Sequence, residues 1–185
     1  MLSPKMLEAM CDHVNKEFYS AYLYMAMSAY CDSIGLKGFA KWFMVQYHEE
    51  MAHTMRVYEY IQKQGNKVKL LNINEPPSSW KSPLDVFENA LKHEQMVSKR
   101  IFALMDLAST EKDHASKIFL QWYVTEQVEE EESVNNIVSQ LRLICDNTQA
   151  LFLLDKDLSA RTVNIPLDFS LGVDTQMKVA GKIQA

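Results

Sequence analysis

The chain has 185 residues and a formal net charge of −5, a length that suits one domain with a substantial buried core. The negative charge gives no reason to expect binding to nucleic acid or to an anionic membrane, and the sequence has no apolar run of the roughly 20 residues that span a bilayer. Three widely spaced cysteines argue against a disulfide framework and against a Cys-x-x-Cys metal site. The first residues lack the apolar core of a signal peptide, so we expect a cytoplasmic protein.

Apolar residues recur in alternating steps of three and four along most of the chain, which predicts long amphipathic helices. The expected helices cover residues 4–33, 38–64, 83–109, 111–146 and 149–158. Ser3-Pro4 is a cap followed by proline at the first helical position, Gly65 ends the second helix, and Thr110 with Asp113 offers a start for the fourth. No structure is assigned to the tail, residues 161–185.

The connections between these helices differ in length. The first and second helices, and the third and fourth, are joined by a few residues, which predicts antiparallel hairpins. Residues 66–81 form a much longer linker. Helices of ~28 residues are about 42 Å long, and an extended linker of this size reaches up to about 53 Å. We therefore expect an all-α four-helix bundle with one long crossover between its second and third helices and a short fifth helix.

Polar residues interrupt the apolar seams near the middle of all four long helices, and they do so twice with the same spacing. The six residues are Glu17, Glu50 and His53 in the first half and Glu94, Gln127 and Glu130 in the second. Each member of the second set follows its counterpart by 77 positions. This arrangement is typical of bundles that hold two metal ions between carboxylates, with one Glu and an i, i+3 pair supplied by each half.

Four carboxylates in one interior are costly unless cations balance them, and two divalent ions would do so. The imidazole of His53 favours iron, manganese or zinc over a site made of oxygen ligands alone. We expect Glu17 and His53 on one metal, Glu94 and Glu130 on the other, and Glu50 as the bridge. Gln127 is uncharged, so the second metal should be held less tightly. For any one position, a metal-free hydrogen-bond network is the simpler alternative. The other histidines are expected at the surface or rim: His13, His48, His93 and His114.

Residues 1 to about 160 resemble the non-haem bacterial ferritins. The matching segments are Glu17-Phe18-Tyr19-Ser20, Glu49-Glu50-Met51-Ala52-His53, His93-Glu94-Gln95, and Phe119-Leu120-Gln121-Trp122-Tyr123 leading into Glu126-Gln127. The resemblance implies a ferritin-like domain over residues 1–160. It also implies a di-iron ferroxidase centre that oxidises Fe(II) with O2, and a homo-oligomeric shell of 24 subunits that stores ferric mineral.

The resemblance also suggests a third iron site and a redox residue. Glu49, Glu126 and Glu129 resemble the third-site ligands of bacterial ferritins, with Glu130 shared. The alternative is a solvated acidic face. Tyr24 lies one heptad after Glu17 on the same seam and is a candidate electron donor, although core packing is the commoner role.

Two neighbouring classes share parts of this pattern. Haem-binding bacterioferritins have a Glu-Met-x-His segment like that around Met51, but they repeat Glu-x-x-His on the fourth helix, where this chain has Gln127-Val128-Glu129-Glu130. This departure disfavours haem. A di-iron oxidase or hydroxylase uses the same bundle and would need a substrate cavity, of which the sequence gives no sign. A purely structural helical protein would not need carboxylates in its seams.

Overall fold

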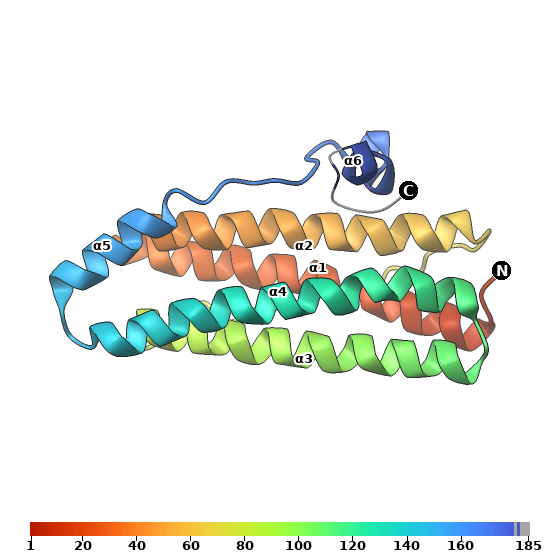
Figure 1. Cartoon of the computed structure of the whole chain (residues 1–185), viewed down its shortest axis with the longest axis horizontal. Helices are drawn as coiled ribbons and strands as arrows, with labels where there is room; N and C mark the ends of the chain where they lie inside the picture. The colour runs from red at the N-terminus through yellow and green to blue at the C-terminus, as the bar shows by residue number, and fades with distance from the viewer. Residues whose placement is uncertain (180, 182–185) are drawn as a thin grey trace. The chain divides into compact units, whose positions relative to one another are not determined.

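The structure is a computed structural model that describes residues 1–179 and 181 (Figure 1), and in this part of the chain it contains helices and no strand. The elements are α1 (Pro4–Ser33), α2 (Lys37–Lys63), α3 (Pro83–Thr110), α4 (His114–Ile144), α5 (Thr148–Leu158), the 3-10 helix η1 (Phe169–Leu171) and α6 (Val173–Val179). The predicted all-α class is confirmed. The end of the predicted tail, residues 180 and 182–185, lies outside the described residues.

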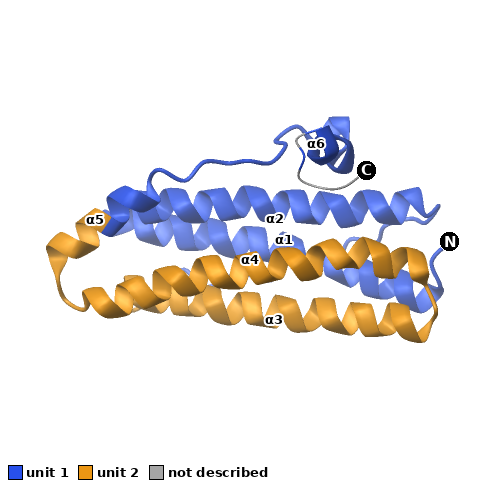
Figure 2. Ribbon diagram, in the orientation of Figure 1, with its two compact units in different colours: residues 1–79, 154–185 blue, residues 80–153 orange. Residues whose placement is uncertain are grey.

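The chain forms two compact units, coloured separately in Figure 2. Unit 1 comprises Met1–Ser79 and Leu154–Ala185 and contains the α1–α2 hairpin, the end of α5, and the tail. Unit 2 comprises Trp80–Leu153 and contains the α3–α4 hairpin. Only residues 34–36 separate α1 from α2, and only residues 111–113 separate α3 from α4. These short connections make each pair antiparallel.

The helix starts follow the capping chemistry of the sequence. The Ser3 hydroxyl accepts a hydrogen bond from the Met6 amide at 3.0 Å, and the Ser82 hydroxyl accepts one from the Asp85 amide at 3.1 Å. The fourth helix begins at His114 and not at residue 111, because Lys112 has a φ of 56° and Asp113 provides the cap. Sequence alone does not distinguish Asp113 from Thr110 as the cap, since both residue types favour that position.

The long linker of residues 64–82 is held against α1 in the part that belongs to unit 1. The Asn15 side chain donates to the Asn72 carbonyl at 2.9 Å and accepts from the Leu71 amide at 3.1 Å. The Cys11 sulfur accepts from the Lys69 amide at 3.3 Å. These contacts replace the regular backbone hydrogen bonds that an extended segment lacks.

Asp155, near the end of α5, caps the start of α2. No side chain next to α2 in sequence caps it, and the Asp155 carboxylate accepts from the Phe39 amide at 3.0 Å instead. The backbone comes equally close: a Cβ added to Gly38 would lie 1.6 Å from the Asp155 carbonyl oxygen. Glycine is therefore required at position 38 for this approach.

The three cysteines are free, with Cys11 and Cys31 buried and Cys145 exposed. Among the helices that the structure describes, none is both long enough and apolar enough to cross a bilayer.

Candidate metal centre

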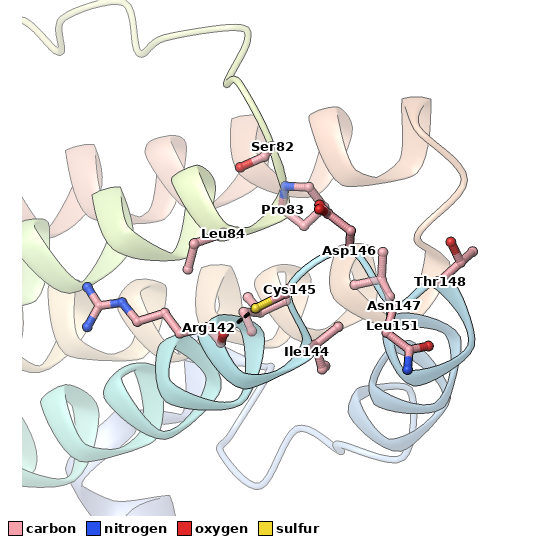
Figure 3. A pocket seen from close by; sticks show the side chains of 11 residues that line it. Ser82, Pro83, Leu84, Arg142, Ile144, Cys145, Asp146, Asn147, Thr148 and Leu151 are labelled. Carbon is pink, nitrogen blue, oxygen red and sulfur yellow. Dashed lines mark hydrogen bonds between the residues drawn. The ribbon is translucent and has the colours of Figure 1, made fainter.

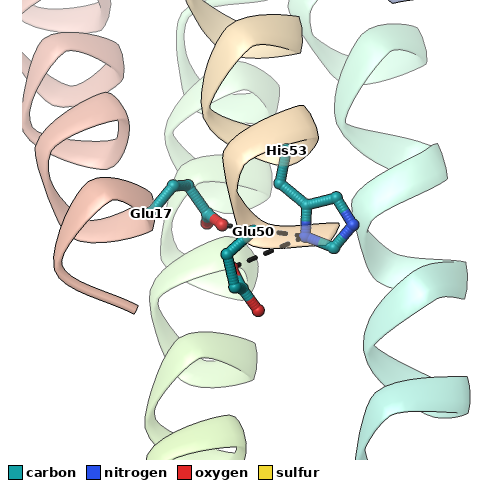
Figure 4. Close-up of side chains that lie close together, drawn as sticks. All are labelled: Glu17, Glu50 and His53. Carbon is teal, nitrogen blue, oxygen red and sulfur yellow. Dashed lines mark ion pairs between the residues drawn. The ribbon is translucent and has the colours of Figure 1, made fainter. Parts of the chain in front are cut away.

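In unit 1, three of the predicted ligands converge in the middle of the α1–α2 hairpin (Figure 4). Glu17 comes from α1, and Glu50 and His53 lie one turn apart on α2. The His53 Nδ1 atom is 3.6 Å from Glu50 Oε2 and 3.9 Å from Glu17 Oε2. One ligand atom from each residue lies within 4.8 Å of the others. Donors bound to one metal at about 2.0–2.2 Å are at most about 4.4 Å apart, so small side-chain movements would close the set on an ion.

The burial of these donors explains why a cation suits them. Glu17 and Glu50 are each 2% exposed, and His53 is 4% exposed. Two carboxylates removed from water cost several kcal/mol each, on the order given for buried ions, unless a positive charge compensates them. A divalent ion offsets both. The mixed oxygen and nitrogen donor set suits iron, manganese or zinc.

His13 belongs to this cluster, although the sequence predicted it at the surface or rim. It is 3% exposed, and its Nδ1 atom lies 3.2 Å from Glu17 Oε1. His93 is likewise buried, at 5% exposed, so the surface prediction was wrong for both residues. The a and d positions describe only the centre of a buried stripe, and these long helices bury a wider face. The i, i+4 spacing from His13 to Glu17 was the available signal.

In unit 2, Glu94 and Gln127 meet across the α3–α4 hairpin. The Gln127 Nε2 atom donates to Glu94 Oε2 at 3.1 Å, and it also lies 3.2 Å from the Glu94 carbonyl and 3.3 Å from the Ser98 hydroxyl. Ser98 in turn donates a short hydrogen bond to Glu131. Ser98 and Glu131 were not among the predicted site residues. Their contact depends on the register between α3 and α4, which spacing along one helix does not give.

This network controls the charge on Glu94, which is fully buried. Burial raises the pKa of Glu94 from its usual 4.5 to about 7; the hydrogen bond from Gln127 opposes the rise, and the nearby Glu131 charge adds to it. Near neutral pH, Glu94 is therefore present in both its protonated and its ionised form. A cation that binds the carboxylate must displace this proton, and at that pH the free-energy cost of removing the proton is small.

The remaining predicted residues lie in different environments. Glu130 on α4 is 5% exposed, Glu126 is half-buried, and Glu129 is exposed. Glu49 on α2 is half-buried, and its Oε2 accepts from Arg161 NH2 at 2.6 Å. Tyr24 is fully buried and stacks on Phe43, with ring centroids 6.0 Å apart.

A pocket in unit 2 lies where α4 ends and α5 begins (Figure 3), with a volume of about 460 Å³. Its lining includes Leu84, Arg142, Cys145 and Leu151. Arg142 lies roughly 22 Å from Gln127 along α4 at 1.5 Å per residue. This pocket therefore does not open onto the Glu94–Gln127 pair.

Comparison with known proteins agrees with this architecture. Residues 7–144 match the family model of the ferritin-like domain. The chain is 39% identical to a bacterial non-heme ferritin of Staphylococcus haemolyticus and 40% identical to one of Staphylococcus aureus; both alignments span 162 residues, 88% of this chain and 98% of the relative. The open pore ferritin of the hyperthermophilic archaeon Archaeoglobus fulgidus superimposes with a TM-score of 0.87 at 51% identity, over 88% of this chain and 100% of the archaeal one.

An engineered closed form of the archaeal protein gives the same TM-score and identity, over 88% of this chain and 99% of its own. The predicted ferritin-like four-helix bundle with a short additional C-terminal helix is thereby confirmed. The chain belongs to the ferritin family.

Proposed function

We propose that this ferritin stores iron and oxidises it on entry, converting Fe(II) to Fe(III) with O2 at a di-iron ferroxidase centre. Family membership supports iron storage. The observation that carries the ferroxidase proposal is the buried Glu17, Glu50 and His53 cluster of unit 1. These donors hold a cation in a place where two uncompensated carboxylates would be unstable.

The two ligand sets have distinct roles in this proposal. Glu17 and His53 bind the first iron, Glu94 and Glu130 bind the second, and Glu50 bridges the two. Gln127 donates to Glu94 through its Nε2 atom, so it orients the carboxylate and stabilises the ionised form. Two Fe(II) ions give up one electron each, and these two electrons with two protons reduce one O2 to hydrogen peroxide.

Glu49, Glu126, Glu129 and Glu130 are proposed as the ligands of a third iron. Tyr24 is proposed as an additional electron donor to the reaction. Its fully buried ring lies one heptad from Glu17 on α1, roughly 10 Å along the helix. We infer that the protein binds no haem, because the two staphylococcal relatives are named as non-heme ferritins.

Residues 1–160 are proposed as the ferritin-like domain, and residues 161–185 as an added tail. Assembly into a shell of 24 subunits is part of the same proposal. It is supported by the likeness to an archaeal protein described as an open pore ferritin. A cytoplasmic location stays a prediction.

Aerobic loading of metal-free protein with excess Fe(II), followed by sedimentation velocity, tests the storage function. We expect protein and iron to sediment together as one large particle that carries far more than three irons per chain. About two irons per chain on a small oligomer would contradict storage and favour a di-iron oxidase or hydroxylase.

Stopped-flow oxidation tests the centre itself. Glu50→Gln should lose most of the fast Fe(II) oxidation, because the bridging charge is removed. Glu8→Gln makes the same change at an exposed position of α1 and should oxidise iron like the wild type. Equal rates in all three proteins would refute the ferroxidase centre.

A further inference from the structure

The far end of the tail is anchored on α2 by specific contacts. The Val173 amide donates to Glu59 Oε1 at 2.7 Å, and Asp174 pairs with Arg56 at 2.8 Å and with Lys63 at 3.2 Å. Val173 is fully buried, and Met177 on the same helix is 3% exposed. Burial lowers the pKa of Lys63, but the charges of Asp174 and Glu59 outweigh it and raise the pKa. The tail is thus a docked segment that follows α2 (Figure 1).

At the start of the tail, the guanidinium of Arg161 contacts two side chains of α2. Arg161 donates to Glu49 Oε2 at 2.6 Å, and its guanidinium carbon lies 4.5 Å from the centroid of the Trp42 ring. Two residues before Arg161, the Ser159 carbonyl accepts a hydrogen bond from the Lys41 side chain at 2.6 Å. The Arg161 and Glu49 side chains are 23% and 18% exposed, so the pair is largely shielded from water.

We propose that Arg161 competes with metal for Glu49: its guanidinium holds the carboxylate that a third iron would use, and it thereby weakens iron binding at the third site. This inference rests on the proposed function, because it takes Glu49 to be a third-site ligand. The guanidinium and the metal exclude each other, since both bind Glu49 and repel one another.

Three properties of the Arg161–Glu49 pair keep the guanidinium bound to the carboxylate. Arginine keeps its charge at every physiological pH, so proton loss does not release Glu49. Stacking on Trp42 fixes the guanidinium, and the short charge-assisted hydrogen bond adds to its hold. A divalent ion displaces it only by binding Glu49 more strongly, which requires the other acidic ligands of the site.

Anaerobic calorimetric titration of the assembled, metal-free protein with Fe(II), repeated with Zn(II), tests this competition. Without O2 the heat reports binding and not oxidation. In Arg161→Ala, we expect the weakest class of sites to bind about tenfold more tightly, within the usual range of coupling between two binding events. The tighter sites should be unchanged. Arg161→Lys retains the positive charge but not the guanidinium that stacks on Trp42, so its weak-site affinity should lie between those of the wild type and Arg161→Ala.

Two further variants separate the charge of Arg161 from loosening of the tail. Arg56→Ala breaks the distal contact to Asp174 without touching Glu49, and it should leave the weakest sites unchanged. Adding Arg161→Ala to Glu49→Gln should produce no gain in affinity, because the shared carboxylate is absent.

The outcomes distinguish this inference from the proposed function. Unchanged weak-site affinity in Arg161→Ala, with tight Fe(II) binding intact, would overturn the competition and leave the ferroxidase proposal standing. Equal gains in Arg56→Ala and Arg161→Ala would also overturn it, since the tail as a whole would then be the cause. No Fe(II) binding by the wild type would remove both.

Discussion

His13 and Glu17 lie one turn apart on α1, with His13 Nδ1 3.2 Å from Glu17 Oε1 and both side chains buried. The imidazole therefore fixes the orientation of a carboxylate whose other oxygen faces His53 at 3.9 Å. A partner of this kind sets the direction in which a ligand presents its lone pairs.

Replacing His13 should weaken metal binding at the Glu17 cluster while leaving the helices intact. For His13→Ala, we expect a loss of about 10- to 100-fold in affinity, the range for partners that orient a metal ligand. Competition titration with a coloured chelator measures it. His13→Gln retains a hydrogen-bond donor and should recover part of the affinity. Wild-type affinity in His13→Ala would show that Glu17 does not need this orientation.

The raised pKa of Glu94 predicts how the stability of the metal-free protein depends on pH. The native state keeps the Glu94 proton up to about pH 7, whereas the unfolded chain loses it near 4.5. The contribution of Glu94 to stability is thus greatest below pH 4.5, falls as the pH rises to about 7, and is constant above that.

Glu94→Gln tests this dependence, because glutamine has the same shape and no charge. We expect the free energy of unfolding of the variant to match that of the wild type near pH 4.5. It should exceed the wild-type value increasingly up to about pH 7, where the difference reaches a plateau on the order of 3 kcal/mol. Thermal melts of both metal-free proteins measure the difference. If the difference in stability between the two proteins does not change with pH, Glu94 does not keep its proton in the native state.

The cysteines should differ sharply in reactivity. Burial, with a smaller effect from Asp155, raises the pKa of the Cys31 thiol to about 12, so at pH 8 roughly one thiol in ten thousand is ionised. Cys145 is exposed. Mass spectrometry after iodoacetamide treatment of native protein should show modification at Cys145 and none at Cys31. Cys145→Ser is the control and should remain unmodified at residue 145. Rapid labelling of Cys31 would contradict its burial.

The Asp155 cap on α2 should contribute measurably to stability. Asp155→Ala removes the acceptor of the Phe39 amide, a loss of about 1 kcal/mol for a helix cap, which corresponds to about 2–4 °C in melting temperature for a chain of this size. Asp155→Asn retains the acceptor and should lose less. Asp157→Ala alters an exposed neighbour and serves as the control. Equal shifts at both positions would indicate a general effect on α5.

Sequence reasoning predicted most of the fold, because helix periodicity and capping are local. The seam interruptions correctly indicated that Glu17, Glu50 and His53 lie together, since a ferritin-like hairpin brings the middles of its two helices side by side. Features that depend on tertiary register were missed. Ser98 reaches Glu131 only because α3 and α4 pack in one particular alignment.

The tail shows the same limit. Residues 161–185 have no sustained periodicity, and the structure of residues 161–179 comes from partners far away in sequence, such as Glu59 for Val173 and Trp42 for Arg161. A short helix of this kind is stable through its docking contacts and not through its own propensity. No reading of the tail by itself identifies those partners.

The docking of α6 through Asp174, Arg56 and Lys63 predicts that this chain unfolds in two steps. Long helices that bury continuous apolar faces unfold together, whereas a seven-residue helix held in large part by ion pairs detaches in a separate step. Salt shortens the reach of those charges from about 10 Å at 0.1 M to about 3 Å at 1 M. Raising the ionic strength should therefore weaken the docking of α6, through the exposed Lys63–Asp174 pair more than through the shielded Arg56–Asp174 pair, under conditions in which the helical hairpins stay folded.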